Sequence, residues 1–237
     1  MQLFLPLIQT NSLDRIRALL QNGCYKEAHD ELSELFEINC SMLDNRRLGK
    51  QRVEAMQIIN SHRTMKRLFQ TWVQNNELDN IIQQCKVREP RNSSIHVNKS
   101  KIGDLTNNQW RGLPQRIKLD NSIGWAHHPM VLMTRNDATF VKIYYNACLN
   151  VWISRGKQNN MSYCVIDEEK ISLPVWFGNL EFHRRHQLKL QEKDKFYNNV
   201  FDPIGEEEVP EYLWWDEDSE LMYEKSITKI YLNPKKN

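Results

Sequence analysis

Apolar side chains recur through the first part of the chain at the three- and four-residue spacing that is typical of amphipathic helices. This spacing predicts helices over residues 12–22 and 25–37, separated by the dipeptide Asn-Gly, which is a helix stop signal. A third helical pattern begins near Ser41 and leaves open a break near residues 60–61.

The pattern changes over residues 86–122, where Pro, Gly, Ser and Asn occur throughout and predict a long loop or insertion. Beyond this stretch, Pro129 suits the first turn of a helix. Apolar spacing then predicts helices over residues 138–155 and 180–193, and a short strand over residues 227–232. Because helices dominate these elements, we expect a mainly α fold.

The helical stretch with the clearest division into two faces is 43–59, LDNRRLGKQRVEAMQII. At 100° per residue, its polar side chains gather within a sector of roughly 100° and its apolar side chains lie opposite. The polar sector holds Arg46, Arg47, Lys50, Glu54 and Gln57, and the apolar sector holds Leu48, Ala55, Met56 and Ile59. A basic face that includes one carboxylate could bind phosphates and transfer a proton. A solvated charged helix is the alternative interpretation.

Charge is distributed unevenly along the chain. The net charge is only +2, so the whole protein is not a polybasic nucleic-acid binder. Residues 43–67 nevertheless carry a local excess of five positive charges, whereas residues 205–224 hold nine acids and no Lys or Arg. We expect the acidic segment to be a solvated loop, and DNA mimicry or partner binding is the alternative.

Several classes of protein find no support in the sequence. The five cysteines are widely spaced and form no CxxC, which argues against a disulfide framework or a zinc ribbon and favours a reducing, intracellular compartment. No window of 18 apolar residues predicts a membrane span. The motifs GxxxxGK[ST], GxGxxG and GxSxG are missing, so nucleotide hydrolysis, dinucleotide redox chemistry and serine hydrolysis are not indicated.

Histidines cluster in two places, at His127–His128 and at His183 and His186. The second pair is spaced i, i+3 and could point one way from a helix. With His128 this pair could bind a metal, as in a metal-dependent nuclease, because imidazole suits zinc and iron. Phosphate contact, helix capping or partial burial are the more ordinary roles for these side chains.

Five segments together resemble the pyrimidine dimer DNA glycosylases of the phage endonuclease V type. In the family's order they are MQLFLP, LDNRRLGKQRVEAMQI, GWAHHPMVLM, YNACLNVWISRGKQNNM and LPVWFGNLEFHRRHQLKLQEKDKFY. They cover roughly half of the chain. Residues 10–38 and 64–120 look like insertions within a single domain that spans residues 1–237, and residues 205–224 form an acidic C-terminal segment.

The resemblance implies an endonuclease V-like fold, a compact helical bundle with long irregular connections. It also implies removal of an ultraviolet-damaged pyrimidine by attack of an N-terminal α-amine, here that of Met1, on the sugar C1′. The Schiff base that forms would allow strand cleavage at the abasic site. Glu54 is our preferred catalytic acid, and Asp44 is its rival, which could instead be a plain acid at the start of a helix.

The implied partner is damaged double-stranded DNA. We expect the protein to act as a monomer, to need no metal or nucleotide cofactor, and not to bind a membrane. The residues expected to contact DNA are basic or histidine side chains of the two long matching segments and of the GWAHHP motif: Arg46, Arg47, Lys50, Arg52, His128, His183, Arg184 and His186. A DNA-binding protein on the same scaffold without lyase chemistry is the alternative.

Overall fold

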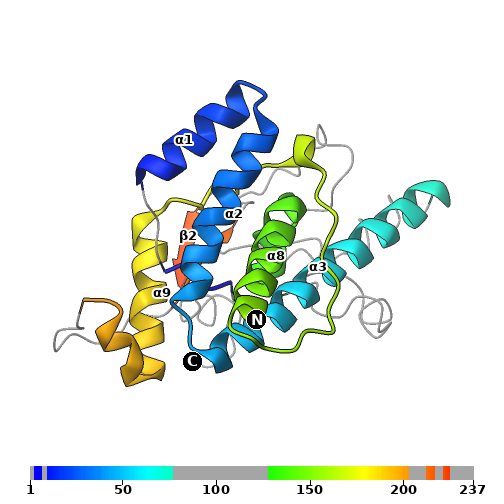
Figure 1. Ribbon diagram of the computed structural model, residues 1–237. Coiled ribbons are helices and arrows are strands. Elements are labelled where there is room, and N and C mark those ends of the chain that lie inside the picture. Colours follow the sequence, from blue (N-terminus) through cyan, green and yellow to red (C-terminus); the bar gives the residue numbers. More distant parts are fainter. Residues whose placement is uncertain (1–2, 7–9, 77–127, 203–211, 217–220, 225–237) are drawn as a thin grey trace, which may run out of the picture. The chain divides into compact units, whose positions relative to one another are not determined.

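The computed structural model describes residues 3–6, 10–76, 128–202, 212–216 and 221–224, and these residues are mainly α-helical (Figure 1). The helices are α1 (Thr10–Gln21), α2 (Tyr25–Ser41), α3 (Asn45–Gln74), α7 (Pro129–Leu132), α8 (Ala138–Ser154) and α9 (Leu180–Lys193). Two 3₁₀ turns, η1 (Glu168–Lys170) and η2 (Lys195–Asn199), and two paired strands, β1 (Leu213–Asp216) and β2 (Leu221–Glu224), complete the described elements. The mainly α fold class is confirmed.

The helix boundaries follow the local stop and start signals. Gly23 and Gly156 take positive φ angles of 72° and 69° directly after α1 and α8, a conformation that glycine adopts at low cost. Pro129 occupies the first turn of α7. The helix α3 continues for 30 residues without a break at residues 60–61.

Three sequence-based expectations concern segments other than the helices. The acidic segment was expected to be a solvated loop, but residues 213–216 and 221–224 within it form a two-stranded sheet. The reason is local, because LWW supplies apolar and aromatic side chains that suit strands, and Leu213 and Trp214 are buried. The predicted loop at 86–122 and strand at 227–232 lie outside the described residues.

The chain falls into two compact units, each built from separate stretches of sequence. The first contains Met1–Ile59 and Thr134–Leu213, and the second contains Asn60–Met133 and Trp214–Asn237. The single domain and the two insertions inferred from the sequence stay predictions.

In the first unit, α2 packs along α8, and α1 packs on α2 (Figure 1). Aromatic rings fill the space between these helices and the turn before α9. Phe36 and Phe140 meet edge to face at 4.9 Å between centroids, and Phe140 meets Phe177 at 4.8 Å. Such pairs each contribute roughly 0.5–1.5 kcal/mol beyond the area that they bury. This core holds α8 and α9 in fixed positions in the unit.

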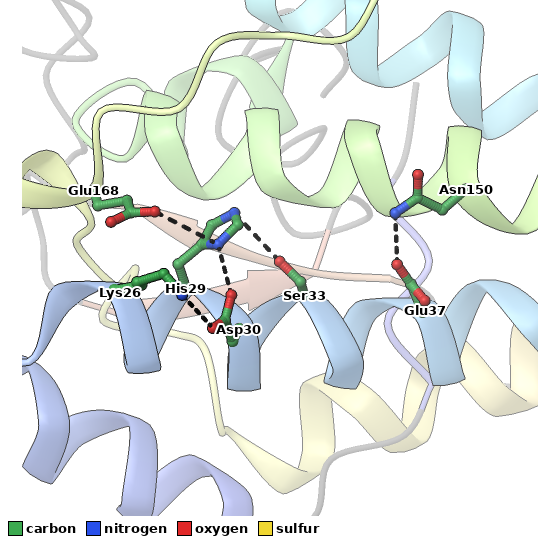
Figure 2. A network of polar contacts seen from close by, with 7 residues as sticks. All are labelled: Lys26, His29, Asp30, Ser33, Glu37, Asn150 and Glu168. Atoms are coloured by element: carbon green, nitrogen blue, oxygen red, sulfur yellow. Dashed lines mark hydrogen bonds and ion pairs between the residues drawn. The ribbon is translucent and has the colours of Figure 1, made fainter.

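Polar side chains join α2 to α8 and to η1 (Figure 2). Asn150 of α8 donates a hydrogen bond to Glu37 at 2.6 Å, and His29 lies 4.0 Å from Glu168 of η1. His29 also lies 3.4 Å from the hydroxyl of Ser33, one turn along the same helix. These contacts are mostly exposed, so each contributes little to stability. Their role is to fix how the helices meet.

In the second unit, the second half of α3 contacts α7. His62 contacts the carbonyl oxygen of Val131 through Nε2 at 3.0 Å. The rings of His128 and Trp214 meet edge to face at 5.8 Å. Within the described residues, no helix is both long and apolar enough to cross a membrane.

Candidate active site

The segment 3–6 is buried and contacts α3 and α9 in the first unit. Leu3, Phe4 and Leu5 are almost completely buried. The amide of Phe4 donates to Oε1 of Gln51 on α3 at 3.0 Å, and the amide of Leu5 donates to Nδ1 of His186 on α9 at 3.2 Å. The backbone near the start of the chain is therefore fixed at both sides by side chains of helices far away in sequence.

Gln51 is the junction of this site. Its Oε1 accepts from the Phe4 amide and lies 2.7 Å from the hydroxyl of Tyr144, which is also 3.1 Å from the Phe4 carbonyl oxygen. Its Nε2 donates to Oε2 of Glu54 at 3.1 Å. Burial raises the pKa of Tyr144, so the phenol stays protonated. Gln51 thus links the N-terminal segment directly to the carboxylate of Glu54.

Glu54 is largely buried, and its carboxylate pairs with a lysine. The residue is 9% exposed, and its Oε1 lies 3.6 Å from Nζ of Lys50, one turn earlier on α3. The side-chain amide of Gln51 and the ammonium of Lys50 thus hold this carboxylate close to the N-terminal segment. The acid predicted from the sequence therefore lies beside the N-terminal segment.

Three cations, Arg47, Lys50 and Lys189, act on Lys193 and form with it a basic cluster that includes the lysine partner of Glu54. The ammonium of Lys193 lies 4.9 Å from the ring centroids of both Phe4 and Tyr212, and it donates a hydrogen bond to the Tyr212 hydroxyl. Although the Lys193 side chain reaches the surface, partial burial of its ammonium, together with the charges of Arg47 and Lys189, lowers its pKa to about 8.

Asp44 has a different role from Glu54. Its Oδ1 accepts from the amides of Arg46 and Arg47 at 2.8 and 3.0 Å, which caps the start of α3, and its Oδ2 accepts from the Tyr197 hydroxyl at 2.6 Å. Partial burial would raise the pKa of Asp44, but the hydrogen bonds from Tyr197 and the two amides outweigh it and lower the pKa. Asp44 therefore caps α3 and binds Tyr197 of η2.

Arg52 points to another part of the first unit. Its guanidinium stacks 3.9 Å from the ring centroid of Trp152 on α8 and donates to the side-chain oxygen of Asn159 at 3.2 Å. A side chain at Gly49 would come within 3.2 Å of the same indole ring, which explains glycine in this helix. Arg52 is therefore engaged with protein groups, whereas Arg46 is exposed and Arg47 half-buried at the start of α3.

His183 and His186 are structural, contrary to the expectation that they contact DNA. His183 donates from Nδ1 to the Leu5 carbonyl oxygen at 2.6 Å and accepts from the Gly178 amide at Nε2. Both rings are almost completely buried, and this burial lowers the pKa of His183 to about 4 and that of His186 well below its usual value. Neutral, buried imidazoles hold the N-terminal segment and do not present a charge to a phosphate. On the same helix, Arg184 is exposed.

His128 caps a helix in the second unit. Its Nδ1 accepts from the amide of Met130 at 3.2 Å, in the first turn of α7. Across the described part of the chain, no group of three or more His, Cys, Asp or Glu side chains is placed to hold a metal ion. Met1, the expected nucleophile, and His127 lie outside the described residues.

Sequence reasoning missed four residues of this site: Phe4, Gln51, Tyr144 and Lys193. Gln51 is part of the motif LGKQRVE, but it lies between the polar and apolar sectors and carries no charge to mark it. Tyr144 has the spacing of a core residue in its helix, and Lys193 looks like an ordinary basic residue at the end of a helix. One signal was present, since MQLFLP begins the chain with apolar residues that need a partner surface.

Comparison with known proteins identifies the family of this chain. The model of the family described as pyrimidine dimer DNA glycosylase matches residues 34–164, which is more than half of the chain. The matched range contains Gln51, Glu54 and Tyr144, and ends before α9. No curated protein and no solved structure matches the chain.

Proposed function

The chain belongs to the pyrimidine dimer DNA glycosylase family, and on this premise we propose a two-part reaction for it. The protein removes ultraviolet-damaged pyrimidines from double-stranded DNA and then cleaves the strand at the resulting abasic site. The nucleophile is the α-amino group of Met1, and the catalytic acid and base is Glu54. The mainly helical architecture is consistent with this family.

The observation that carries the proposal is the hydrogen-bonded path from Phe4 through Gln51 to Glu54. Covalent geometry keeps the Met1 nitrogen within about 11 Å of the Phe4 nitrogen, because each residue spans at most ~3.6 Å. A terminal amine and a fixed carboxylate can therefore address one sugar. An α-amine has an ordinary pKa near 7.7–8.0, which nearby cations lower, so a useful fraction is neutral at neutral pH.

The chemistry follows from these groups. The amine lone pair attacks C1′ while the bond from C1′ to the damaged base breaks, and the base leaves with a proton. The carboxylate of Glu54 stabilises the positive charge that develops on the sugar. In the ring-opened imine, Glu54 takes the C2′ proton, the bond from C3′ to oxygen breaks, and water then releases the amine.

DNA is held by the exposed cations near the site. Arg46, Arg47 and Lys50 at the start of α3 and Arg184 on α9 contact phosphates in this proposal, which is supported by the exposure of Arg46, Lys50 and Arg184. Opening a damaged base pair costs less than opening a sound one, which favours the lesion. The alternative of DNA binding without chemistry uses the same cations.

We further propose that the protein acts as a monomer without a metal or a nucleotide cofactor, in a reducing, intracellular compartment. Support for the compartment comes from the cysteines. Cys24, Cys40, Cys148 and Cys164 are free thiols, and the buried Sγ atoms of Cys40 and Cys148 lie only 3.2 Å apart. Burial raises the pKa of Cys40, which keeps this thiol protonated.

Borohydride trapping on a duplex that contains one abasic site tests the reaction. We expect a covalent protein–DNA adduct with the wild type, because borohydride reduces the imine to a stable amine. Glu54→Gln should lower single-turnover strand cleavage by about 10²-fold or more, the usual contribution of a general acid or base. The matched control is Asp44→Asn, which still caps α3 and should cleave within a few-fold of the wild type.

The opposite pattern, loss of cleavage in Asp44→Asn alone, would assign the acid to Asp44. If no variant gives an adduct but all bind duplex DNA in a salt-dependent manner, the protein is a DNA-binding protein without lyase activity.

A further inference from the structure

We propose that Lys193 is a second Schiff-base-forming amine of this site, which acts on abasic sites already present in DNA. This inference rests on the proposed lyase function and adds a nucleophile to it. The first support is position. Lys193 is the last residue of α9, and its Nζ lies 4.9 Å from the ring of Phe4, whose amide is bonded to Gln51 and through it to Glu54.

The second support is the way the amine is held. The rings of Phe4 and Tyr212 are both 4.9 Å from Nζ, and the Tyr212 hydroxyl accepts a hydrogen bond from it. A lysine on a flexible stem is usually free to move, so two rings and a hydroxyl fix the direction of this one. The side chain still reaches the surface, so a sugar can approach it.

The third support is charge. Partial burial of Nζ and the charges of Arg47, Lys189 and Lys50 disfavour the ammonium form, and although Glu192 favours it, together they lower the pKa of Lys193 to about 8. At pH 7.5 roughly a quarter of such an amine is neutral and nucleophilic, against about 0.1% for an ordinary lysine. The same cations would attract the phosphates on either side of an abasic sugar.

The step is complete with water as the only other reactant. The lone pair of Nζ attacks C1′ of the ring-opened aldehyde, and the adduct loses water to give a protonated imine. Glu54 takes a proton from C2′, the bond from C3′ to oxygen breaks, and the 3′ strand leaves with its 5′-phosphate. Hydrolysis of the imine then returns the free amine. No bond to a base is broken, so this amine needs an abasic site and not a lesion.

The test separates the two amines by mapping borohydride-trapped adducts with mass spectrometry. One variant carries a Ser-Gly-Ser-Gly extension before Met1, which displaces the α-amine from the site. Lys193→Arg keeps the positive charge and its contacts with the rings but cannot form an imine. The control is Lys195→Arg, two residues further along in η2, where the side chain is exposed.

We expect the extended protein to retain an adduct that maps to Lys193. Adding Lys193→Arg to the extension should reduce that adduct at least tenfold while duplex binding stays within about twofold, and Lys195→Arg should change neither. Adducts only at Met1, with Lys193→Arg equal to the wild type, would overturn the inference and leave the proposed function intact. Adducts spread over many lysines, Lys195 included, would overturn it as well. No adduct in any protein would remove both proposals.

Discussion

At the scale of single residues, a neutral histidine holds the N-terminal segment in place. His183 uses both ring nitrogens, one toward the Leu5 carbonyl oxygen and one toward the Gly178 amide, and it can do so only as a neutral imidazole. Its burial lowers the pKa to about 4. The fold therefore binds fewer protons at this position than the unfolded chain does in mildly acidic solution.

This difference predicts a loss of stability in acid. The unfolded pKa is near 6.5 and the folded pKa near 4, so stability is intact above pH 6.5 and falls as the pH drops through that window. From pH 7 to pH 5, His183 alone should lower the free energy of unfolding by about 2 kcal/mol. Denaturant titrations at the two pH values measure this, and His183→Gln should flatten the slope. An unchanged slope, or an NMR titration of the His183 ring near pH 6.5, would contradict the assignment.

The two acids of α3 show why single residues are hard to assign from sequence. Asp44 and Glu54 both lie beside basic residues, and spacing left both open as the catalytic acid. Hydrogen bonds separate them, because Asp44 caps the helix and binds Tyr197, while Glu54 binds Gln51, which in turn binds the amide of Phe4 in the N-terminal segment. Tyr197 lies 153 positions from Asp44, and Phe4 lies 47 positions from Gln51, so neither contact can be read from local spacing.

At the scale of elements, α1 is packed against the turn that introduces α9. Arg17 donates to the carbonyl oxygen of Phe177, and Leu13 lies directly against Gly178. Gly178 has φ of 101°, outside the region that side chains tolerate. Helix α1 lies in the stretch that looked like an insertion, yet its apolar face covers residues that position α9 and with it Lys193.

Gly178→Ala should therefore be strongly destabilising. Backbone strain and a clash with Leu13 together should cost about 3 kcal/mol. Gly23→Ala is the matched control, because it has a φ of 72° but open space around it and should cost only about 1 kcal/mol. Denaturant unfolding gives both values. Combining Gly178→Ala with Leu13→Ala should recover part of the difference relative to Leu13→Ala alone, and equal costs for the two glycines would refute the packing argument.

At the scale of the whole molecule, a net charge of +2 is too small to hold DNA by itself, so the location of the cations matters. Arg46 and Lys50 are exposed one turn apart on α3, near the site. Lys26 on α2 and Lys170 on η1 are also exposed, and they pair with Asp30 and Asp167 as Lys50 pairs with Glu54. Arg46 and Lys50 therefore carry the same total charge as Lys26 and Lys170, but at a different place on the protein.

The double variant Arg46→Gln and Lys50→Gln should weaken duplex binding and reduce the slope of log K against log salt by about 2, because each phosphate contact contributes about 0.9. The double variant Lys26→Gln and Lys170→Gln removes the same charge and should leave the slope nearly unchanged. Fluorescence anisotropy at several salt concentrations measures both. Equal effects of the two variants would mean that net charge, not a site on α3, drives binding.

Much of the fold was readable from local sequence. The ends of α9 coincide with the predicted residues 180–193, and α1, α2 and α8 lie within a few residues of their predictions, because apolar spacing and glycine stops act within one or two turns. The family resemblance was also readable, since long strings such as LDNRRLGKQRVEA carry it, and the match over residues 34–164 confirms it.

The sequence by itself determined the helices, the basic character of α3 and the family, because each depends on residues close together in the chain or on their order. Tertiary structure alone decided which polar groups meet. It buried His183 and His186 beneath the N-terminal segment, joined Phe4 to Glu54 through Gln51, and set Lys193 between two rings. Burial and distance between remote residues fix hydrogen bonds and pKa values, and no local pattern encodes either.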